Sequence, residues 1–128
     1  MGIYGTGENI RYWLFVRDHV KILYTIMLKG KIGEKYCIGG TQELSNIDLF
    51  KTIHKIIKNI MKLDILPLDQ SYPFVKNRLV HDYRYSVDIK KITNDFNINI
   101  TTNINEDLLK TIKFYSNLKK SKIQNGFT

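Results

Sequence analysis

Short strand-like runs alternate with helical apolar periods along this chain, and every run is brief. Residues 12–16 read Tyr-Trp-Leu-Phe-Val, an aromatic and β-branched run typical of a buried strand. Residues 35–38 form a second such run, which Gly39 and Gly40 end. Strands this short cannot form a sheet that is stable alone. The pattern therefore predicts an α/β protein whose strands depend on helices.

Helical apolar spacing predicts two helices in the first half of the chain. Asp18 stands in an N-cap position, and apolar residues recur at helical spacing until Gly30 closes the first helix. Ser45 or Asn46 can cap the second helix, which is predicted over residues 47–62.

The second half is predicted to hold two more helices. A proline-bounded, irregular connection leads to residues 84–87, which can form a short strand. Asp88 can cap a helix of about two turns over residues 89–96, because its carboxylate can accept from a free N–H group. A last amphipathic helix is expected to begin near Asn105.

The length of 128 residues leaves room for one domain, which is predicted at residues 1–118 and followed by a polar, frayed tail at 119–128. No apolar stretch is long enough to cross a membrane, and the N-terminus does not resemble a secretory signal. The lone Cys37 cannot form an internal disulfide, which fits a reducing compartment. These features predict a cytoplasmic protein without a membrane partner.

The basic balance of the chain has two interpretations. Lysine and arginine total 20 against 12 acidic residues, a net charge of +8. Lysines recur at helical spacing at positions 51, 55, 58 and 62, which could form a footprint for a phosphate backbone or the solvated side of an amphipathic helix. No nucleic-acid-binding motif accompanies them, so the second interpretation is favoured and a nucleic-acid partner is not expected.

Common catalytic and cofactor motifs are not found in the sequence. His19, His54 and His81 are scattered, which predicts no metal site. The Gly5-Thr6-Gly7 run follows no strand and opens no long helix, so it is interpreted as a turn and not as a dinucleotide-binding loop. The sequence therefore predicts no catalytic group and no cofactor site in this chain.

Two polar segments are candidates for a binding site. Residues 9–13 place Arg11 beside aromatic residues, and residues 77–85 combine arginines, a histidine and tyrosines. Arginines from two distant segments could converge on a diphosphate, because the planar guanidinium matches phosphate oxygens. Alternatively, Arg78 and Arg84 pair on the surface with the nearby aspartates at positions 82 and 88.

At these residues the sequence resembles a known family. Residues 3–19 read Ile-Tyr-Gly-Thr-Gly-Glu-Asn-Ile-Arg-Tyr-Trp-Leu-Phe-Val-Arg-Asp-His, which is similar to a signature of the dTDP-glucose 4,6-dehydratases, extended short-chain dehydrogenases/reductases. The resemblance continues at residues 30–40, 46–48, 81–88 and 110–115. It covers about residues 2–118, in order and with family-like spacing.

The resemblance implies a reaction that this chain would not perform alone. Enzymes of the family oxidise the sugar C4 with a bound NAD, eliminate water across C5 and C6, and return the hydride to C6. Their glycine-rich NAD loop, Tyr-x-x-x-Lys pair and acidic dehydration residues lie upstream of the matched region. The chain is thus expected to be the C-terminal substrate-binding portion of an extended short-chain dehydrogenase/reductase that lacks most of the Rossmann domain. It would hold no NAD itself and would depend on a separate N-terminal NAD-binding half.

The resemblance also implies a set of contacts to a dTDP-sugar nucleotide. Arg11 and Arg78 fall on arginines that hold the diphosphate, and His81 falls on a contact near the nucleotide. The full set of expected substrate-binding residues is Gly2, Ile3, Tyr4, Arg11, Asn46, Asn77, Arg78 and His81.

Several positions depart from the family pattern. Leu79 and Val80 stand where the family has Pro-Gly, and a valine forced to a positive φ would cost about 1–2 kcal/mol. Tyr12, Arg17 and Cys37 replace two acidic residues and an asparagine. These changes indicate relaxed selection or altered specificity.

Three functions are thus considered. The first is a truncated or split dTDP-glucose 4,6-dehydratase-like protein, inactive alone. The second is a non-catalytic nucleotide-sugar binding module, and the third is a basic nucleic-acid-binding protein. Because in the family these elements pack against the cofactor domain, apolar residues such as Trp13, Leu14, Phe15 and Ile38 are expected to be uncovered here, and self-association is predicted.

Overall fold

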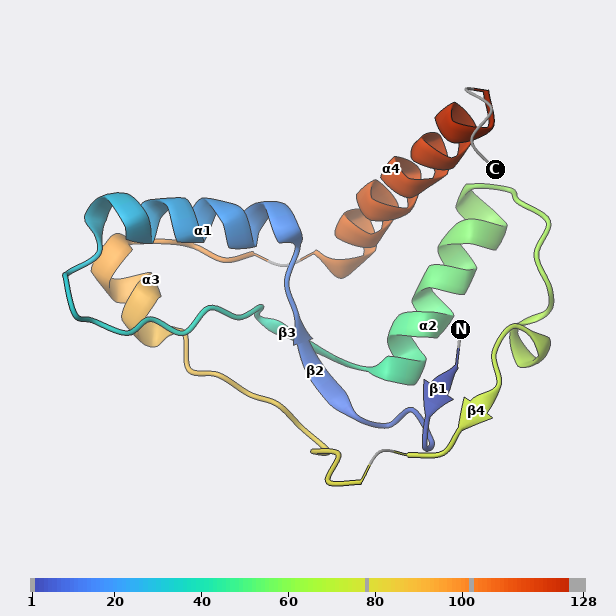
Figure 1. Cartoon of the computed structure of the whole chain (residues 1–128), viewed down its shortest axis with the longest axis horizontal. Coiled ribbons are helices and arrows are strands. Elements are labelled where there is room, and N and C mark those ends of the chain that lie inside the picture. Colours follow the sequence, from blue (N-terminus) through green and yellow to red (C-terminus); the bar gives the residue numbers. More distant parts are fainter. Residues whose placement is uncertain (1, 78, 102, 125–128) are drawn as a thin grey trace.

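The computed structural model describes residues 2–77, 79–101 and 103–124, with side chains described as far as position 118. Helices and strands alternate along this range, which confirms the α/β prediction (Figure 1). The strands are β1 (Ile3–Tyr4), β2 (Ile10–Trp13), β3 (Gln42–Ser45) and β4 (Phe74–Val75). The helices are α1 (Val16–Lys29), α2 (Asn46–Lys55), α3 (Lys90–Phe96) and α4 (Ile104–Gln124), with a π-helical turn η1 (Ile56–Ile60) and a 3-10 turn η2 (Leu68–Gln70).

Two small sheets organise the molecule. β2 and β3 pair antiparallel, with Ile10 opposite Ser45 and Trp13 opposite Gln42. β1 and β4 pair in parallel, with Ile3 opposite Phe74. In Figure 1 the β2–β3 pair lies between the α1–α3 half and the α2–α4 half of the molecule.

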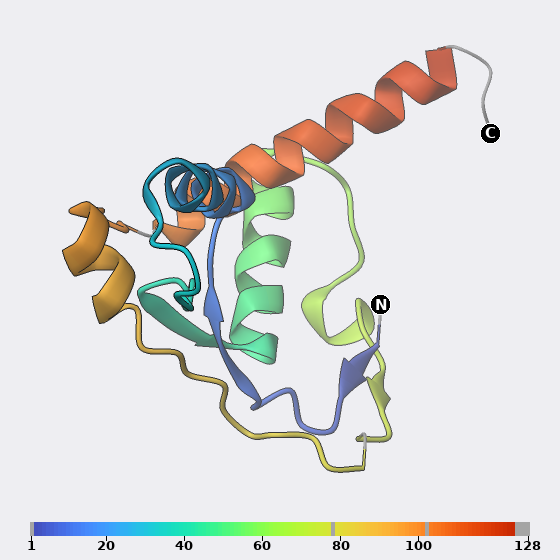
Figure 2. The ribbon, with the colours of Figure 1, turned by 60° about the vertical axis from the view of Figure 1, so that its left-hand side comes forward.

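Helices α1 and α3 enclose the main apolar core. Ile22 of α1, Ile92 of α3 and Ile100 are buried together, and seven partly buried apolar side chains pack around them. Ile92 is fully buried. In both views the two helices lie side by side (Figures 1 and 2).

Helix α2 packs against the connection that leads to β4. The Phe50 and Tyr72 rings meet edge to face with centroids 4.6 Å apart, and Tyr72 in turn meets Phe74. His54 is buried, and its Nε2 lies 2.9 Å from the Leu66 carbonyl. Figure 2 shows α4 running from this half of the molecule outward, away from the other elements.

The first strand and helix begin earlier than the sequence predicted. β2 occupies positions 10–13 instead of 12–16, and α1 begins at Val16. The Phe15 carbonyl accepts hydrogen bonds from the amides of Asp18 and His19, so the first turn closes on Phe15. The prediction that Asp18 caps α1 is therefore wrong, because Asp18 lies within the first turn, where its negative charge still favours the helix N-terminus.

The predicted strand at residues 35–38 is not a strand. β2 pairs instead with positions 42–45, which follow the two glycines. A Cβ atom on Gly40 would lie 1.9 Å from the Trp13 carbonyl oxygen, so the chain passes β2 there closely enough to exclude any side chain. The predicted strand at 84–87 reduces to one bridge between Arg84 and Ile10.

Helix termini follow the sequence only in part. Ser45 caps α2, since its Oγ accepts from the Asp48 amide at 3.1 Å. The predicted cap of α3 is displaced by one residue: Ile89 is its N-cap, and the Asp88 carboxylate, one position earlier, accepts from the Lys90 amide at 2.8 Å. The second helix was predicted to continue to residue 62, but α2 ends at Lys55 and changes to a π-helical turn. Helix α4 continues through Gln124, beyond the position where a polar tail was predicted to begin.

No helix within the described residues is long and apolar enough to cross a membrane.

Candidate functional site

Arg11 is the centre of the first polar cluster. It lies on β2, and its guanidinium donates to backbone carbonyls of Ile10, Asp82 and Tyr83 and to the ring of His81. The guanidinium carbon also lies 4.4 Å from the centroid of the Tyr85 ring, a cation–π contact. Arg11 therefore joins β2 to the 81–85 segment, two regions that the sequence identified separately.

His81 connects Arg11 to two more expected site residues. Its Nδ1 lies 2.7 Å from Asn77 Oδ1, and its Nε2 lies 3.1 Å from Arg11 Nη2. Because Asn77 Oδ1 can only accept and the guanidinium can only donate, the ring carries its proton on Nδ1 and accepts at Nε2. The Tyr4 ring meets the imidazole edge to face, with centroids 6.2 Å apart. Four of the expected residues, Tyr4, Arg11, Asn77 and His81, are thus brought together.

The other expected site residues have different positions. Ile3 is buried in the β1–β4 pair, and Gly2 lies against the Val75 side chain. Asn46 is the first residue of α2, and its amide donates to the Asn9 carbonyl. Arg78 lies outside the described residues, so its expected diphosphate contact stays a prediction.

Val80 adopts the strained conformation expected from the family pattern. Its φ is +54°, in the left-handed region where a β-branched residue is rare. The His81–Asn77 hydrogen bond spans this turn. Val80 is almost fully exposed, so no packing compensates for the strain.

The Gly5-Thr6-Gly7 run is a turn, as predicted. Both glycines have positive φ, +58° and +77°, and the Gly7 amide donates to the Tyr4 carbonyl. The space beside them is filled by side chains of Asn77 and Ile47. This turn does not fit a dinucleotide, which needs open space beside its glycines.

Specific partners shift the pKa values of ionisable groups around the cluster. A hydrogen bond with Asp82 raises the pKa of Tyr85 above its ordinary value. Arg84 pairs with Glu43 of β3, and this contact raises the pKa of Arg84. The expected pairing of Arg84 with Asp82 or Asp88 is therefore wrong, because β2 brings the facing strand β3 and its Glu43 closer.

Asn9 was not identified as a site residue from the sequence. It is buried, and its Nδ2 donates to the Asp82 carbonyl at 3.1 Å. Its own carbonyl accepts from the Asn46 amide. A buried side-chain amide needs polar partners, but neither the burial of Asn9 nor its partner 73 positions away can be read from the sequence.

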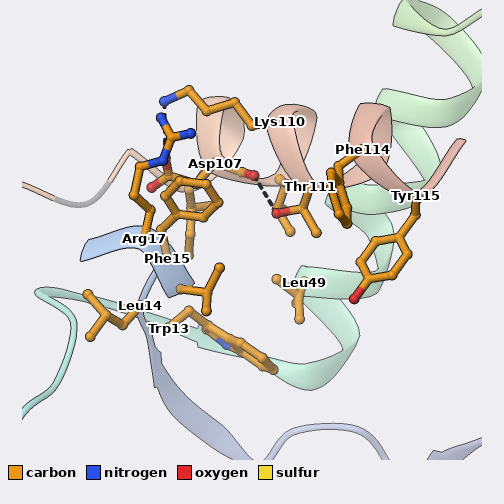
Figure 3. Close-up of a pocket in the computed structure, with 13 residues that line it drawn as sticks. Trp13, Leu14, Phe15, Arg17, Leu49, Asp107, Lys110, Thr111, Phe114 and Tyr115 are labelled. Atoms are coloured by element: carbon orange, nitrogen blue, oxygen red, sulfur yellow. Dashed lines mark hydrogen bonds and ion pairs between the residues drawn. The ribbon is translucent and has the colours of Figure 1, made fainter. Parts of the chain in front are cut away.

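A separate apolar groove of about 660 Å³ lies at the C-terminal end of β2 (Figure 3). Trp13 and Phe15 approach it from the β2–α1 junction, while Phe114 and Tyr115 approach it from α4. Leu49 of α2 forms part of its floor. No expected site residue that the structure describes lines this groove.

The described residues contain no group of three or more histidine, cysteine or acidic side chains that could hold a metal ion.

Comparisons with known proteins agree with the sequence resemblance. The family model for GDP-mannose 4,6 dehydratase matches residues 1–111. A dTDP-glucose 4,6-dehydratase of Escherichia coli is 40% identical over 121 residues, covering 92% of this chain and 33% of the relative. The enzyme of the same name from Haemophilus influenzae is 37% identical, covering 88% of this chain and 34% of the relative.

Solved structures show the same relationship. A dTDP-glucose 4,6-dehydratase from Bacillus anthracis in complex with NAD superposes with a TM-score of 0.75 at 28% identity, covering 93% of this chain and 35% of that one. The enzyme from Streptomyces venezuelae with NAD and TYD bound gives 0.74 at 30% identity, with 91% and 34% covered. The chain spans about a third of the length of these relatives. It therefore belongs to the family that the GDP-mannose 4,6 dehydratase model describes, with a fold that matches part of the extended short-chain dehydrogenase/reductase structure of the dTDP-glucose 4,6-dehydratases.

Proposed function

We propose that this chain supplies the nucleotide-sugar contacts of a dTDP-glucose 4,6-dehydratase-like protein. The observation that carries the proposal is the convergence of Tyr4, Arg11, Asn77 and His81 from segments far apart in the sequence. A guanidinium beside an imidazole and two exposed tyrosines suits a ligand that combines a diphosphate with a base or sugar ring.

Each residue has a defined role in this proposal. Arg11 binds the diphosphate as a planar donor, and Asn77 and His81 contact the nucleotide at the edge of the cluster. Asn46 and Gly2 are assigned neighbouring contacts and Arg78 a second cation, whereas the buried Ile3 supports the site through the β1–β4 pair.

The hydride chemistry is assigned to an NAD-binding region other than the described residues. The glycine turn at positions 5–7 is filled by neighbouring side chains, so this chain does not offer NAD a glycine cradle. The purified chain is therefore expected to bind dTDP-glucose without converting it to a 4-keto sugar. A non-catalytic binding module, the second candidate, would behave identically alone and would stay inactive when an NAD-binding half is supplied.

A face of α1 is available for this partner half. Its outward residues are large and apolar, with exposed fractions of 47–71%. Apolar residues on a helix face recur every three or four positions, which aligns these side chains in one stripe. They are Val16, Val20, Leu23, Tyr24, Met27 and Leu28. The residues expected to be uncovered, such as Trp13 and Ile38, are only half-exposed, and this difference in exposure supports α1 as the contact surface.

Isothermal titration with dTDP-glucose tests the binding proposal. Arg11→Ala is expected to weaken binding about 10- to 100-fold, because hydrogen bonds to charged groups contribute about 1.5–3 kcal/mol. Arg17→Ala is the matched control, since Arg17 lines the apolar groove and does not belong to the Arg11 cluster. Equal affinity of wild type and Arg11→Ala, or no binding by the wild type, would contradict the proposal.

A further inference from the structure

The Arg11 guanidinium uses its terminal donors in two different environments. Nη1 donates to Ile10 O at 2.6 Å and Nη2 to His81 Nε2 at 3.1 Å, and both contacts are partly buried. Nη1 also donates to Tyr83 O at 3.3 Å and Nη2 to Asp82 O at 3.1 Å, and both of these contacts are exposed. Each terminal nitrogen thus makes one exposed hydrogen bond, and the two carbonyls that accept these bonds belong to consecutive residues.

This arrangement resembles a bidentate acceptor. Two oxygens that face both terminal nitrogens of a guanidinium are the geometry that a phosphate or carboxylate presents. The carbonyls are neutral, whereas phosphate oxygens are charged and form stronger hydrogen bonds with the same donors. A diphosphate could therefore replace the two carbonyls at the solvent-facing side of Arg11.

Both carbonyls retain a second donor if Arg11 leaves them. Asp82 O also accepts from Asn9 Nδ2 at 3.1 Å, and Tyr83 O also accepts from the Ile10 amide at 2.8 Å. A carbonyl oxygen has two lone pairs, and only an acceptor that loses every donor incurs the full desolvation cost. The exchange therefore leaves no unsatisfied carbonyl and does not release the 81–85 segment from β2.

We propose that Asn9 is a positioning residue for diphosphate binding. It holds the Asp82 carbonyl, so that Arg11 can exchange its two exposed carbonyl contacts for two oxygens of a diphosphate. Asn9 does not touch the ligand, and its burial, with 7% exposed, fixes the amide against the segment. The inference rests on the proposed nucleotide-sugar function. It adds the residue that lets Arg11 exchange its carbonyl contacts for diphosphate oxygens.

The test combines titration calorimetry with carbonyl carbon NMR, using thymidine diphosphate as the probe. In the wild type, saturation should shift the carbonyl ¹³C signals of Asp82 and Tyr83 in the direction of a lost hydrogen bond. The Ile10 amide should keep its protection from exchange. Asn9→Ala should weaken binding about tenfold, because Asp82 O then has no donor once Arg11 leaves. Asn105→Ala, an exposed asparagine in the first turn of α4, is the control and should bind as the wild type does.

The outcomes separate this inference from the proposed function. No binding of thymidine diphosphate by the wild type would overturn both. Binding without movement of the two carbonyl signals, or unchanged affinity of folded Asn9→Ala, would overturn the role of Asn9 and leave the nucleotide site in place. If circular dichroism shows that Asn9→Ala does not fold, the wild-type carbonyl signals decide. If the role of Asn9 were merely structural, its replacement would not change which carbonyl ¹³C signals shift on binding.

Discussion

Replacing Val80 with glycine is expected to stabilise the protein. Val80 has a φ of +54° and is 98% exposed, so its side chain packs against almost nothing. The left-handed conformation costs an L-residue about 1–2 kcal/mol, and glycine removes this cost. The greater conformational freedom of glycine in the unfolded chain offsets about 0.5–1 kcal/mol of this gain. The net gain is about 0.5–1 kcal/mol, which corresponds to a rise in Tm of about 2–6 °C for a domain of this size.

Thermal unfolding followed by circular dichroism measures this effect. Leu79→Gly is the matched control, because Leu79 lies in the same turn, is 92% exposed and does not have a positive φ. It gains nothing from glycine and should lower Tm slightly through the unfolded state. A Tm of Val80→Gly at or below that of the wild type would refute the strain argument, and an equal rise in both variants would refute it as well.

Three more outcomes are expected. Gly40→Ala should destabilise the fold by about 3 kcal/mol or more, because its Cβ would lie 1.9 Å from the Trp13 carbonyl oxygen; chemical denaturation checks this, and near-wild-type stability would contradict it. Ser45→Ala should raise the pKa of Asp48, because the hydrogen bond from the Ser45 hydroxyl is the largest cause of its lowered pKa. Since the pKa of Asp48 is lower in the folded than in the unfolded state, its stabilisation is present above the unfolded pKa and is lost as pH falls through the folded pKa. A carboxyl ¹³C titration of Asp48 that is identical in wild type and variant would disprove the assignment. Leu23→Asp should reduce self-association of the isolated chain, because it places a charge on the exposed apolar face of α1. Size-exclusion chromatography with light scattering measures this, and a wild type that stays monomeric at high concentration would contradict the prediction.

The sequence predicted features whose cause is local. The sequence left Ser45 or Asn46 as the cap of α2, and the structure shows that Ser45 is the cap, since its Oγ accepts from the Asp48 amide three positions on. The turn at positions 5–7 depends on glycines at positive φ. The strand at 35–38 was wrongly predicted because β propensity reports how side chains fit a half-buried surface and not which backbone they pair with. Tyr36 and Ile38 do pack against the core around Ile22, but without a strand partner.

The candidate site was predictable through the family resemblance more than through physical pattern. The residue type of Arg11 suggested a phosphate contact, and the resemblance implied a nucleotide contact for His81. The structure brings the two side chains within hydrogen-bonding distance. The role of Asn9 was not visible, because its partner is a backbone carbonyl 73 positions away. The Glu43 partner of Arg84 was missed for the same reason, since the β2–β3 register had not been predicted.

The site is assembled almost entirely from pairings between segments about 70 residues apart. β1 meets β4 through two residue pairs, and Ile10 meets Arg84 through one bridge. Chain-closure entropy must be overcome before such contacts stabilise the fold, whereas α1 and α2 form from neighbours in sequence. The helices are therefore expected to fold early, and the Arg11 cluster is expected to form last and open first. A ligand bound there would act as the final contact that closes the chain.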